Sequence, residues 1–215
     1  MKEYHKIQTM FKREQKKPCR IIEGEWTIPE FEYLKNNKWE FTEKVDGTNI
    51  RVMFDGSNIR YGGKTDNAQT PCDLIERLGN IFEPNIDKMV EMFPSKNDAP
   101  PQVCFYGEGY GAGIQKGGVY RPTKDFVCFD IKIGESWLTR ENIEDICGKL
   151  GVDIVPVVGY GTLEDGIKIV REGFKSKWGD FIAEGIVARP CVDIRGRYGR
   201  IITKIKHCDF FKEIK

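Results

Sequence analysis

The sequence predicts an α+β fold in which antiparallel sheets are flanked by helices. Three observations predict it. Short strand-like segments joined by Asp-Gly turns lie near the start of the chain, helical spacings interrupt the later strands, and the two do not alternate as they do around a parallel sheet. At 215 residues, with no long linker and no internal repeat, the chain is expected to form a single domain over 1–215.

The first part of the chain predicts a meander of hairpins. Residues 1–38 are expected to form short helices and turns. The alternating segment 39–46 indicates a strand, Asp46-Gly47 supplies a turn, and 50–54 indicates the return strand. A second Asp-Gly turn then leads into a short strand at 58–61.

The later elements alternate irregularly between helix and strand. Apolar spacing indicates helices over 72–93, 139–150 and 162–173, and Gly151 closes the second of them. Apolar runs indicate strands, with a glycine-rich loop between the first two. The expected strands are 103–106, 126–133, 154–158, 181–188 and 200–205, and the loop is 107–118.

The charge is balanced overall but unevenly distributed. The net charge of +1 excludes a uniformly basic protein that coats nucleic acid. Residues 12–20 nevertheless carry five basic and one acidic side chain, and residues 195–215 carry seven and two. These ends offer a modest set of phosphate contacts, so we expect weak, salt-sensitive binding of a polynucleotide. The set comprises Lys12, Arg13, Lys16, Lys17, Arg20, Arg195, Arg197 and Arg200.

The remaining composition predicts an intracellular protein without a structural metal. Seven cysteines without a C-x-x-C pair, and only two histidines, argue against a disulfide framework and against a zinc site. The apolar runs are too short for a transmembrane helix, and the first ten residues lack the apolar core of a signal peptide. We therefore expect a cytoplasmic location, no membrane partner and a monomer.

Lys44 and Asp46, in the segment E-K-V-D-G-T-N, are the first residues that indicate chemistry. In an extended strand they would point to the same face. A lysine at such a site can act as a nucleophile when nearby cations or burial lower its pKa. The alternative is a hairpin carrying a solvated Lys–Asp pair.

Four further segments repeat the pattern of a charged residue at or near a strand end. They are Y-G-E-G around Glu108, F-V-C-F-D-I around Phe129, A-E-G-I-V around Glu184, and T-K-I-K with Lys204 and Lys206. Taken singly, each has a structural alternative as an edge residue or a core aromatic.

In this order and spacing, the five segments resemble the nucleotidyltransferase motifs of the covalent nucleotidyltransferase superfamily, which contains polynucleotide ligases and mRNA capping enzymes. The resemblance covers residues 39–206 and is closest to ATP-dependent RNA ligases of the T4 RNA ligase 2 type, in their nucleotidyltransferase (adenylation) domain. Asn49, where many ligases and capping enzymes have arginine, favours that RNA ligase branch.

The resemblance assigns a role to each motif residue. It implies that Lys44 attacks the α-phosphate of ATP, that Asp46 assists adenylate positioning and sealing, and that Glu43 and Asn49 belong to the nucleotide site. It further implies roles for the remaining residues. Those are Glu108 on the ribose, Phe129 (or Phe126) stacked on the base, Glu184 on Mg²⁺ or Mn²⁺, and Lys204 and Lys206 on the α-phosphate.

One position departs from the family pattern. Lys64 stands where the family places an arginine that binds the 5′-phosphate or the AMP phosphate, and Arg60 is the rival candidate. A lysine offers a point charge and not a bidentate fork, so the two residues would orient a phosphate differently.

The resemblance implies an ATP-dependent RNA ligase that joins 5′-phosphate and 3′-hydroxyl ends through a lysyl–AMP intermediate, as in RNA repair. Its expected partners are RNA ends or a nicked duplex. The alternatives are a DNA ligase, a capping-type guanylyltransferase and a non-catalytic module that binds nucleic-acid ends. No C-terminal OB-fold or helical domain is expected after Lys206. The cations around Lys44 are expected to lower its pKa.

Overall fold

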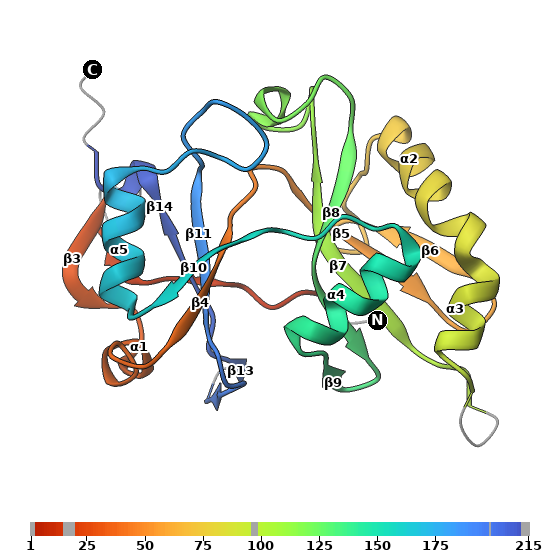
Figure 1. Ribbon diagram of the computed structural model, residues 1–215, viewed down its shortest axis with the longest axis horizontal. Helices are drawn as coiled ribbons and strands as arrows, with labels where there is room; N and C mark the ends of the chain where they lie inside the picture. The colour runs from red at the N-terminus through yellow and green to blue at the C-terminus, as the bar shows by residue number, and fades with distance from the viewer. Residues whose placement is uncertain (1–2, 15–19, 96–98, 198, 212–215) are drawn as a thin grey trace. The chain divides into compact units, whose positions relative to one another are not determined.

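The computed structural model describes residues 3–14, 20–95, 99–197 and 199–211 (Figure 1). It is an α+β structure with two five-stranded, mainly antiparallel sheets, as the sequence predicted. The length and patterning predicted one domain over 1–215. Within it, residue contacts form two compact units: unit 1 contains Tyr4 and Asp46–Val155, and unit 2 contains His5–Val45 and the chain from Pro156 onward.

The sheet of unit 2 has the strand order β1-β14-β11-β4-β10. Its strands are β1 Gln8–Thr9, β14 Thr203–Lys206, β11 Gly185–Pro190, β4 Trp39–Glu43 and β10 Val157–Gly161. All neighbours are antiparallel except β1 and β14. One face of the sheet packs against helix α5 Leu163–Glu172 in a core that includes Trp39, Phe41 and Ile186. The opposite face carries the alternate residues of β4, β11 and β14.

Shorter elements complete unit 2. Strands β2 Phe11–Arg13 and β3 Ile21–Trp26 form a hairpin, as do β12 Arg195–Gly196 and β13 Gly199–Arg200. Helix α1 Pro29–Tyr33 and the 3-10 turn η3 His207–Asp209 follow β3 and β14.

The sheet of unit 1 has the order β6-β5-β7-β8-β9 and is antiparallel throughout. Its strands are β6 Ile59–Gly62, β5 Thr48–Phe54, β7 Val103–Tyr110, β8 Asp125–Ile133 and β9 Ser136–Trp137. Three helices contribute apolar side chains to the core on one face of this sheet: α2 Cys72–Phe82, α3 Ile86–Met92 and α4 Arg140–Leu150. The turns η1 Glu83–Asn85 and η2 Gly117–Val119 lie between elements.

Most predicted elements are present, with shifted ends. Helix α4 begins after Thr139, whose hydroxyl accepts the Asn142 N–H, and ends at Gly151 with φ 66°, the left-handed conformation that favours glycine. Strand β7 continues through the segment expected to open the glycine loop, so Glu108 lies inside the strand. A Cβ at Gly107 would stand 2.3 Å from the Phe126 ring, and this close approach explains a glycine within the strand.

Two predictions about the first fifty residues were wrong. In the described parts of segment 1–38 the chain forms three strands and one short helix, where turns and helices were expected. Strands β4 and β5 do not pair as a hairpin, because β4 belongs to the sheet of unit 2 and β5 to that of unit 1. Strand β4 ends at Glu43, so Lys44 and Asp46 do not share a strand face, and the unit boundary falls between Val45 and Asp46.

Candidate active site

Lys44, Glu184 and Lys206 form a compact cluster on the sheet of unit 2. The Glu184 carboxylate accepts a hydrogen bond from Lys44 Nζ on Oε2 at 2.7 Å, and Lys206 Nζ lies 2.6 Å from Oε1. All three side chains are mostly buried, with the Glu184 side chain only 15% exposed. Two ammonium groups thus share one carboxylate in a place where water screens charge poorly.

Strand register produces this cluster. Strand β11 lies between β4 and β14, and Lys206 stands opposite Gly185. The Lys44 N–H donates to the Gly185 carbonyl at 2.9 Å, and the His207 N–H donates to the Glu184 carbonyl at 2.8 Å. The backbone carbonyls of Glu184 and Gly185 are therefore bonded to the segments that continue β14 and β4, so three segments distant in sequence meet at the carboxylate.

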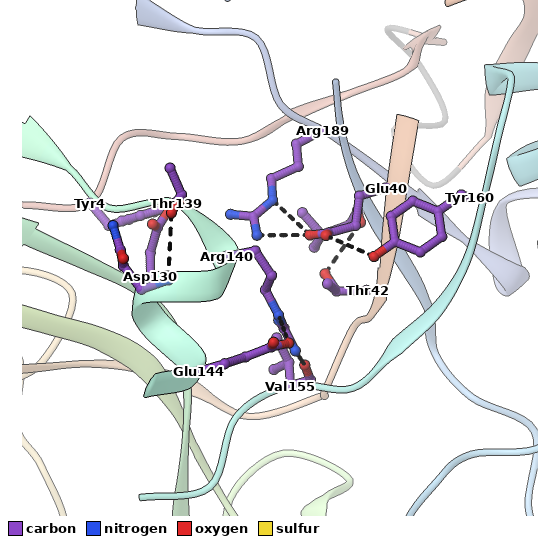
Figure 2. A network of polar contacts seen from close by, with 12 residues as sticks. Tyr4, Glu40, Thr42, Asp130, Thr139, Arg140, Glu144, Val155, Tyr160 and Arg189 are labelled. Carbon is purple, nitrogen blue, oxygen red and sulfur yellow. Dashed lines mark hydrogen bonds and ion pairs between the residues drawn. The ribbon is translucent and has the colours of Figure 1, made fainter. Parts of the chain in front are cut away.

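A buried ion pair further along β4 and β11 fixes the register. Glu40 stands opposite Arg189, and its Oε1 accepts from Arg189 Nε at 2.9 Å and lies 2.7 Å from Nη2. Tyr160 donates its hydroxyl hydrogen bond to Glu40 Oε2 at 3.4 Å (Figure 2). A one-residue slip would break this pair and turn Lys44 to the other face of the sheet. The pair therefore positions Lys44 from four residues away, and neither of its members stands in a motif found in the sequence.

Lys204 adds a third cation beside the cluster. It lies on β14 on the same face as Lys206, two residues away. Burial lowers the pKa of Lys204, the charges of Lys206, Lys44 and Arg13 lower it further, and Glu184 acts in the opposite direction. The folded state thus disfavours the charged form of this side chain.

Replacing Lys204 by methionine is expected to raise the free energy of unfolding at neutral pH by on the order of 1 kcal/mol, because a poorly solvated cation beside other cations is removed. The lowered pKa makes the unfolded chain bind more protons above the folded-state pKa. Lys204 therefore adds a rise in stability as the pH increases from that pKa to the ordinary lysine value. Urea unfolding of both proteins across alkaline pH measures this difference. A less stable variant, or one with an unchanged pH profile, would contradict the expectation.

Glu43 points away from the lysine cluster. Its side chain is 1% exposed and its Oε2 accepts the Lys177 N–H at 2.9 Å. Burial raises the pKa of Glu43, while hydrogen bonds from Lys177 and Ser176 oppose the rise. Its contacts here are therefore with the 176–177 segment.

Asn49 and Glu108 lie side by side in unit 1. They are directly paired between β5 and β7, on the sheet face opposite the helices, and both are partly exposed. The Asn49 Oδ1 atom is buried and has no hydrogen-bond partner among the described residues. Upstream, the Asp46 N–H donates to the Tyr120 hydroxyl at 3.1 Å, which ties the start of unit 1 to the loop after β7. Tyr120 stands in none of the motifs found in the sequence.

A β-bulge displays Phe129. Tyr106 stands opposite Asp130 and Gly107 opposite Cys128, so Phe129 is the extra residue on β8 and remains partly exposed. Bulges of this kind re-aim a side chain out of the regular alternation. The alternative, Phe126, is 1% exposed and packs in the core against Phe82 at 5.8 Å between ring centroids. The geometry therefore favours Phe129 as a stacking surface.

Tyr4 supports the bulge from outside the motifs. Its ring meets Phe129 edge-on at 5.0 Å, and its hydroxyl donates to Asp130 Oδ2 at 2.8 Å. No sequence signal surrounds Tyr4, which lies 125 positions before Phe129.

Arg60 and Lys64 lie at different levels of the unit 1 sheet. Arg60 is exposed on β6 opposite Met53, whereas Lys64 is exposed just beyond the end of β6. Met53 is four residues from Asn49, or roughly 13 Å along an extended strand. Pairing between β5 and β6 ends at Arg51 and Gly62, so Lys64 follows the β6 end on the Asn49 side of the sheet, whereas Arg60 lies further from Asn49.

The donor set for a metal is sparse. Within the described parts of the chain, no group of three or more His, Cys, Asp or Glu side chains converges. Glu184 offers one carboxylate, already in contact with two cationic groups. A Mg²⁺ or Mn²⁺ ion fits there if phosphate and water oxygens supply its other ligands, which is usual for Mg²⁺ at nucleotide sites.

None of the helices described is long and apolar enough to cross a membrane.

Most of the terminal basic residues are paired within the chain. Lys16 and Lys17 fall outside the described residues. Five of the other six, all except Arg197, form the following ion pairs among the described residues: Lys12–Glu25, Arg13–Asp209, Arg20–Glu14, Arg195–Asp193 and Arg200–Asp193.

Comparison with known families identifies the fold. The RNA ligase family model matches residues 37–206, which include the lysine cluster, the Asn49–Glu108 pair and the Phe129 bulge. The chain belongs to the RNA ligase family. None of the curated proteins matches it.

Solved structures agree with the family assignment at low sequence identity. The chain is similar to the Naegleria gruberi RNA ligase in a mutant without ligand, with 19% identity, a TM-score of 0.64, and coverage of 97% of this chain and 58% of that one. A second mutant, with ATP and Mn, has 17% identity and a TM-score of 0.67, and the match covers 96% of this chain and 56% of that one. The ligase with PPi has 21% identity and a TM-score of 0.61, and the match covers 95% of this chain and 57% of that one. The chain therefore shares their fold and spans less than three fifths of their length.

Proposed function

We propose that this chain is the adenylyltransferase part of an ATP-dependent RNA ligase that joins 5′-phosphate and 3′-hydroxyl ends through a lysyl–AMP intermediate. The observation that carries the proposal is the cluster of Lys44, Glu184 and Lys206, with Lys204 beside it, in a chain of the RNA ligase family. A nucleophilic amine, an acid that can hold a proton or a metal, and spare positive charge are what transfer of a nucleotide to lysine requires.

Lys44 is the proposed nucleophile. After its ammonium group loses a proton, the Nζ lone pair forms a P–N bond to the α-phosphorus of ATP, and the bond from that phosphorus to the bridging oxygen breaks to release pyrophosphate. Glu184 Oε2, 2.7 Å from Nζ, is placed to hold or receive the proton. Lys204 and Lys206 offset the negative charge that spreads over the phosphoryl oxygens.

Glu184 is also the proposed metal ligand. Some of the similar Naegleria gruberi structures contain ATP and Mn, which supports ATP and a divalent cation as cofactors here. When bound, such a cation supplies positive charge at the phosphate oxygens. Glu184 has one carboxylate for the metal and for Lys44, so the two compete for it. Binding of the metal to Glu184 would therefore release Lys44 from its ion pair with that carboxylate.

The residues of unit 1 fit the nucleoside and the acceptor strand. The partly exposed Phe129 ring offers a stacking surface for a base, and Glu108 offers carboxylate oxygens to ribose hydroxyls. Asn49, beside Glu108, has an amide oxygen with no described partner, which could accept from a hydroxyl.

The proposal is tested by labelling and by sealing. The purified chain is incubated with α-labelled ATP or GTP in Mg²⁺ or Mn²⁺, and covalent label is followed after denaturation. We expect label from ATP, dependent on the metal, and little from GTP. A preference for GTP would indicate a capping-type guanylyltransferase. Absence of label together with retained RNA binding would indicate a non-catalytic end-binding module.

The substrate is tested with nicked duplexes of RNA, DNA and an RNA–DNA hybrid, assayed side by side. Membership of the RNA ligase family leads us to expect faster sealing when RNA supplies the ends at the nick. Fastest sealing of the all-DNA nick would replace RNA by DNA as the proposed substrate.

A further inference from the structure

Arg51 is a fully buried arginine in the middle of strand β5. Its neighbours in sequence, Ile50 and Val52, point into the helix-covered core, so Arg51 lies on the opposite sheet face, the face of Asn49 and Glu108. Its side chain is only 1% exposed. Burying a guanidinium group has a desolvation cost of several kcal/mol, so its retention here requires a reason.

The guanidinium group holds the turn that follows β6. Arg51 Nε donates to the Gly63 carbonyl at 2.8 Å, and Nη2 donates to Asp66 Oδ1 at 2.6 Å. Gly62, opposite Arg51 on β6, leaves room for the group, because a Cβ there would stand 3.4 Å from Nη2. The two bonded residues flank Lys64 and Thr65 on both sides. Arg51 therefore fixes the chain at the two ends of the segment that carries Lys64.

Stability alone does not account for this arrangement. The Asp66 side chain is 85% exposed, and an ion pair with so exposed a partner contributes little to the free energy of folding. The hydrogen bond and charge of Arg51 nevertheless lower the pKa of the Asp66 carboxyl. The contact restricts an exposed turn whose only lysine is Lys64.

We propose that Arg51 is a positioning residue that, through Gly63 and Asp66, holds the turn carrying Lys64 at the end of β6, so that Lys64 binds a phosphate of the adenylate or of the RNA 5′ end. The proposal rests on the proposed ligase function. It assigns the phosphate contact to Lys64 and not to Arg60. A lysine lacks the fork of an arginine, and the contacts of Arg51 restrict the backbone from which this lysine extends.

A double-mutant cycle tests the proposal. Asp66→Asn removes the charged partner at an exposed site and is expected to fold, whereas Lys64→Ala removes the phosphate contact. We expect each single variant to lower kcat/KM of the affected step, self-adenylation or sealing, by about tenfold. The reason is that a charge-assisted hydrogen bond to phosphate is lost or misaligned. The double variant is expected to fall by about the same tenfold, because Asp66 acts only through Lys64. Asp66→Glu should restore part of the loss.

The assays separate the two phosphates and the two hypotheses. Self-adenylation with ATP and sealing of a pre-adenylated strand are measured separately, and the affected step identifies the phosphate. Asp87→Asn, an exposed aspartate on α3, is the control. If kcat/KM of the double variant fell about a hundredfold, or if Asp66→Asn left kcat/KM unchanged, the positioning role would be overturned. The ligase function would still stand in that case, provided that the unmodified chain labels itself with ATP. Failure of the unmodified chain to label would instead remove the ligase function, and this inference with it.

Discussion

Replacing Lys44 by alanine is expected to abolish covalent labelling by α-labelled ATP. Loss of the nucleophile in enzymes that form covalent intermediates lowers the rate by on the order of 10⁴-fold or more. The Lys44 side chain is 20% exposed, and Lys206 remains beside Glu184 after the change, so the fold should persist. The variant should therefore bind ATP, remain unlabelled and fail to seal a nick that requires ATP.

Two further variants serve as controls for this result. Lys88→Ala removes an exposed lysine from α3 and should label normally. Lys44→Arg keeps a cation beside Glu184 but cannot lose its proton at working pH, so it should fold and stay unlabelled. Peptide mapping of the labelled protein gives an independent check, since the adduct should lie on Lys44. Label that persists in Lys44→Ala would contradict the assignment of Lys44 as the nucleophile.

The same variant separates the chemical steps. A nicked RNA whose 5′ end already carries AMP needs no lysyl–AMP, so Lys44→Ala should retain part of the final sealing step. A variant that fails at this step as completely as at labelling would assign Lys44 a further role in the last reaction.

The sequence predicted the elements of the fold better than their pairing. Helix α4 follows from Thr139, Gly151 and the apolar spacing between them, all of which act locally. The pairing of β4 with β5 was wrong because Asp46-Gly47 carries the local signal of a hairpin, while the partners of β4 lie more than a hundred residues away in β10 and β11. Nonlocal pairing of this kind leaves no short-range signature.

The candidate site was likewise predicted where the signal is local and missed where it depends on nonlocal contacts. Lys44, Glu108, Glu184 and the two lysines of β14 stand in short motifs and were predicted from them as candidates. Arg51, Tyr4 and Tyr120 were not, because their roles depend on contacts that only the folded chain supplies. Arg51 could not be singled out from its segment, because a charged residue between Ile50 and Val52 fits the ordinary alternation of a strand with one buried and one exposed face. Its burial becomes visible only in the folded chain.

Replacing Glu184 by glutamine is expected to cause the second-largest loss. The variant keeps the shape of the side chain but leaves Lys44, Lys204 and Lys206 without the carboxylate that offsets their charges. Removing one partner of a buried pair costs about 3–5 kcal/mol, and partial exposure of these side chains reduces the expected cost to about 2 kcal/mol. Chemical denaturation should show this loss, with Glu172→Gln, an exposed acid at the end of α5, as the control.

Activity and stability should respond differently to conditions in the Glu184→Gln variant. Added salt screens the repulsion among the lysines and should recover part of the stability. It cannot restore a metal ligand or a proton acceptor, so labelling should stay at least about a hundredfold below that of the unmodified chain, even at high Mn²⁺. If salt restored labelling together with stability, Glu184 would be only a counter-ion for the lysines. If neither quantity changed on mutation, the carboxylate at the centre of the cluster would have no role in the proposed reaction.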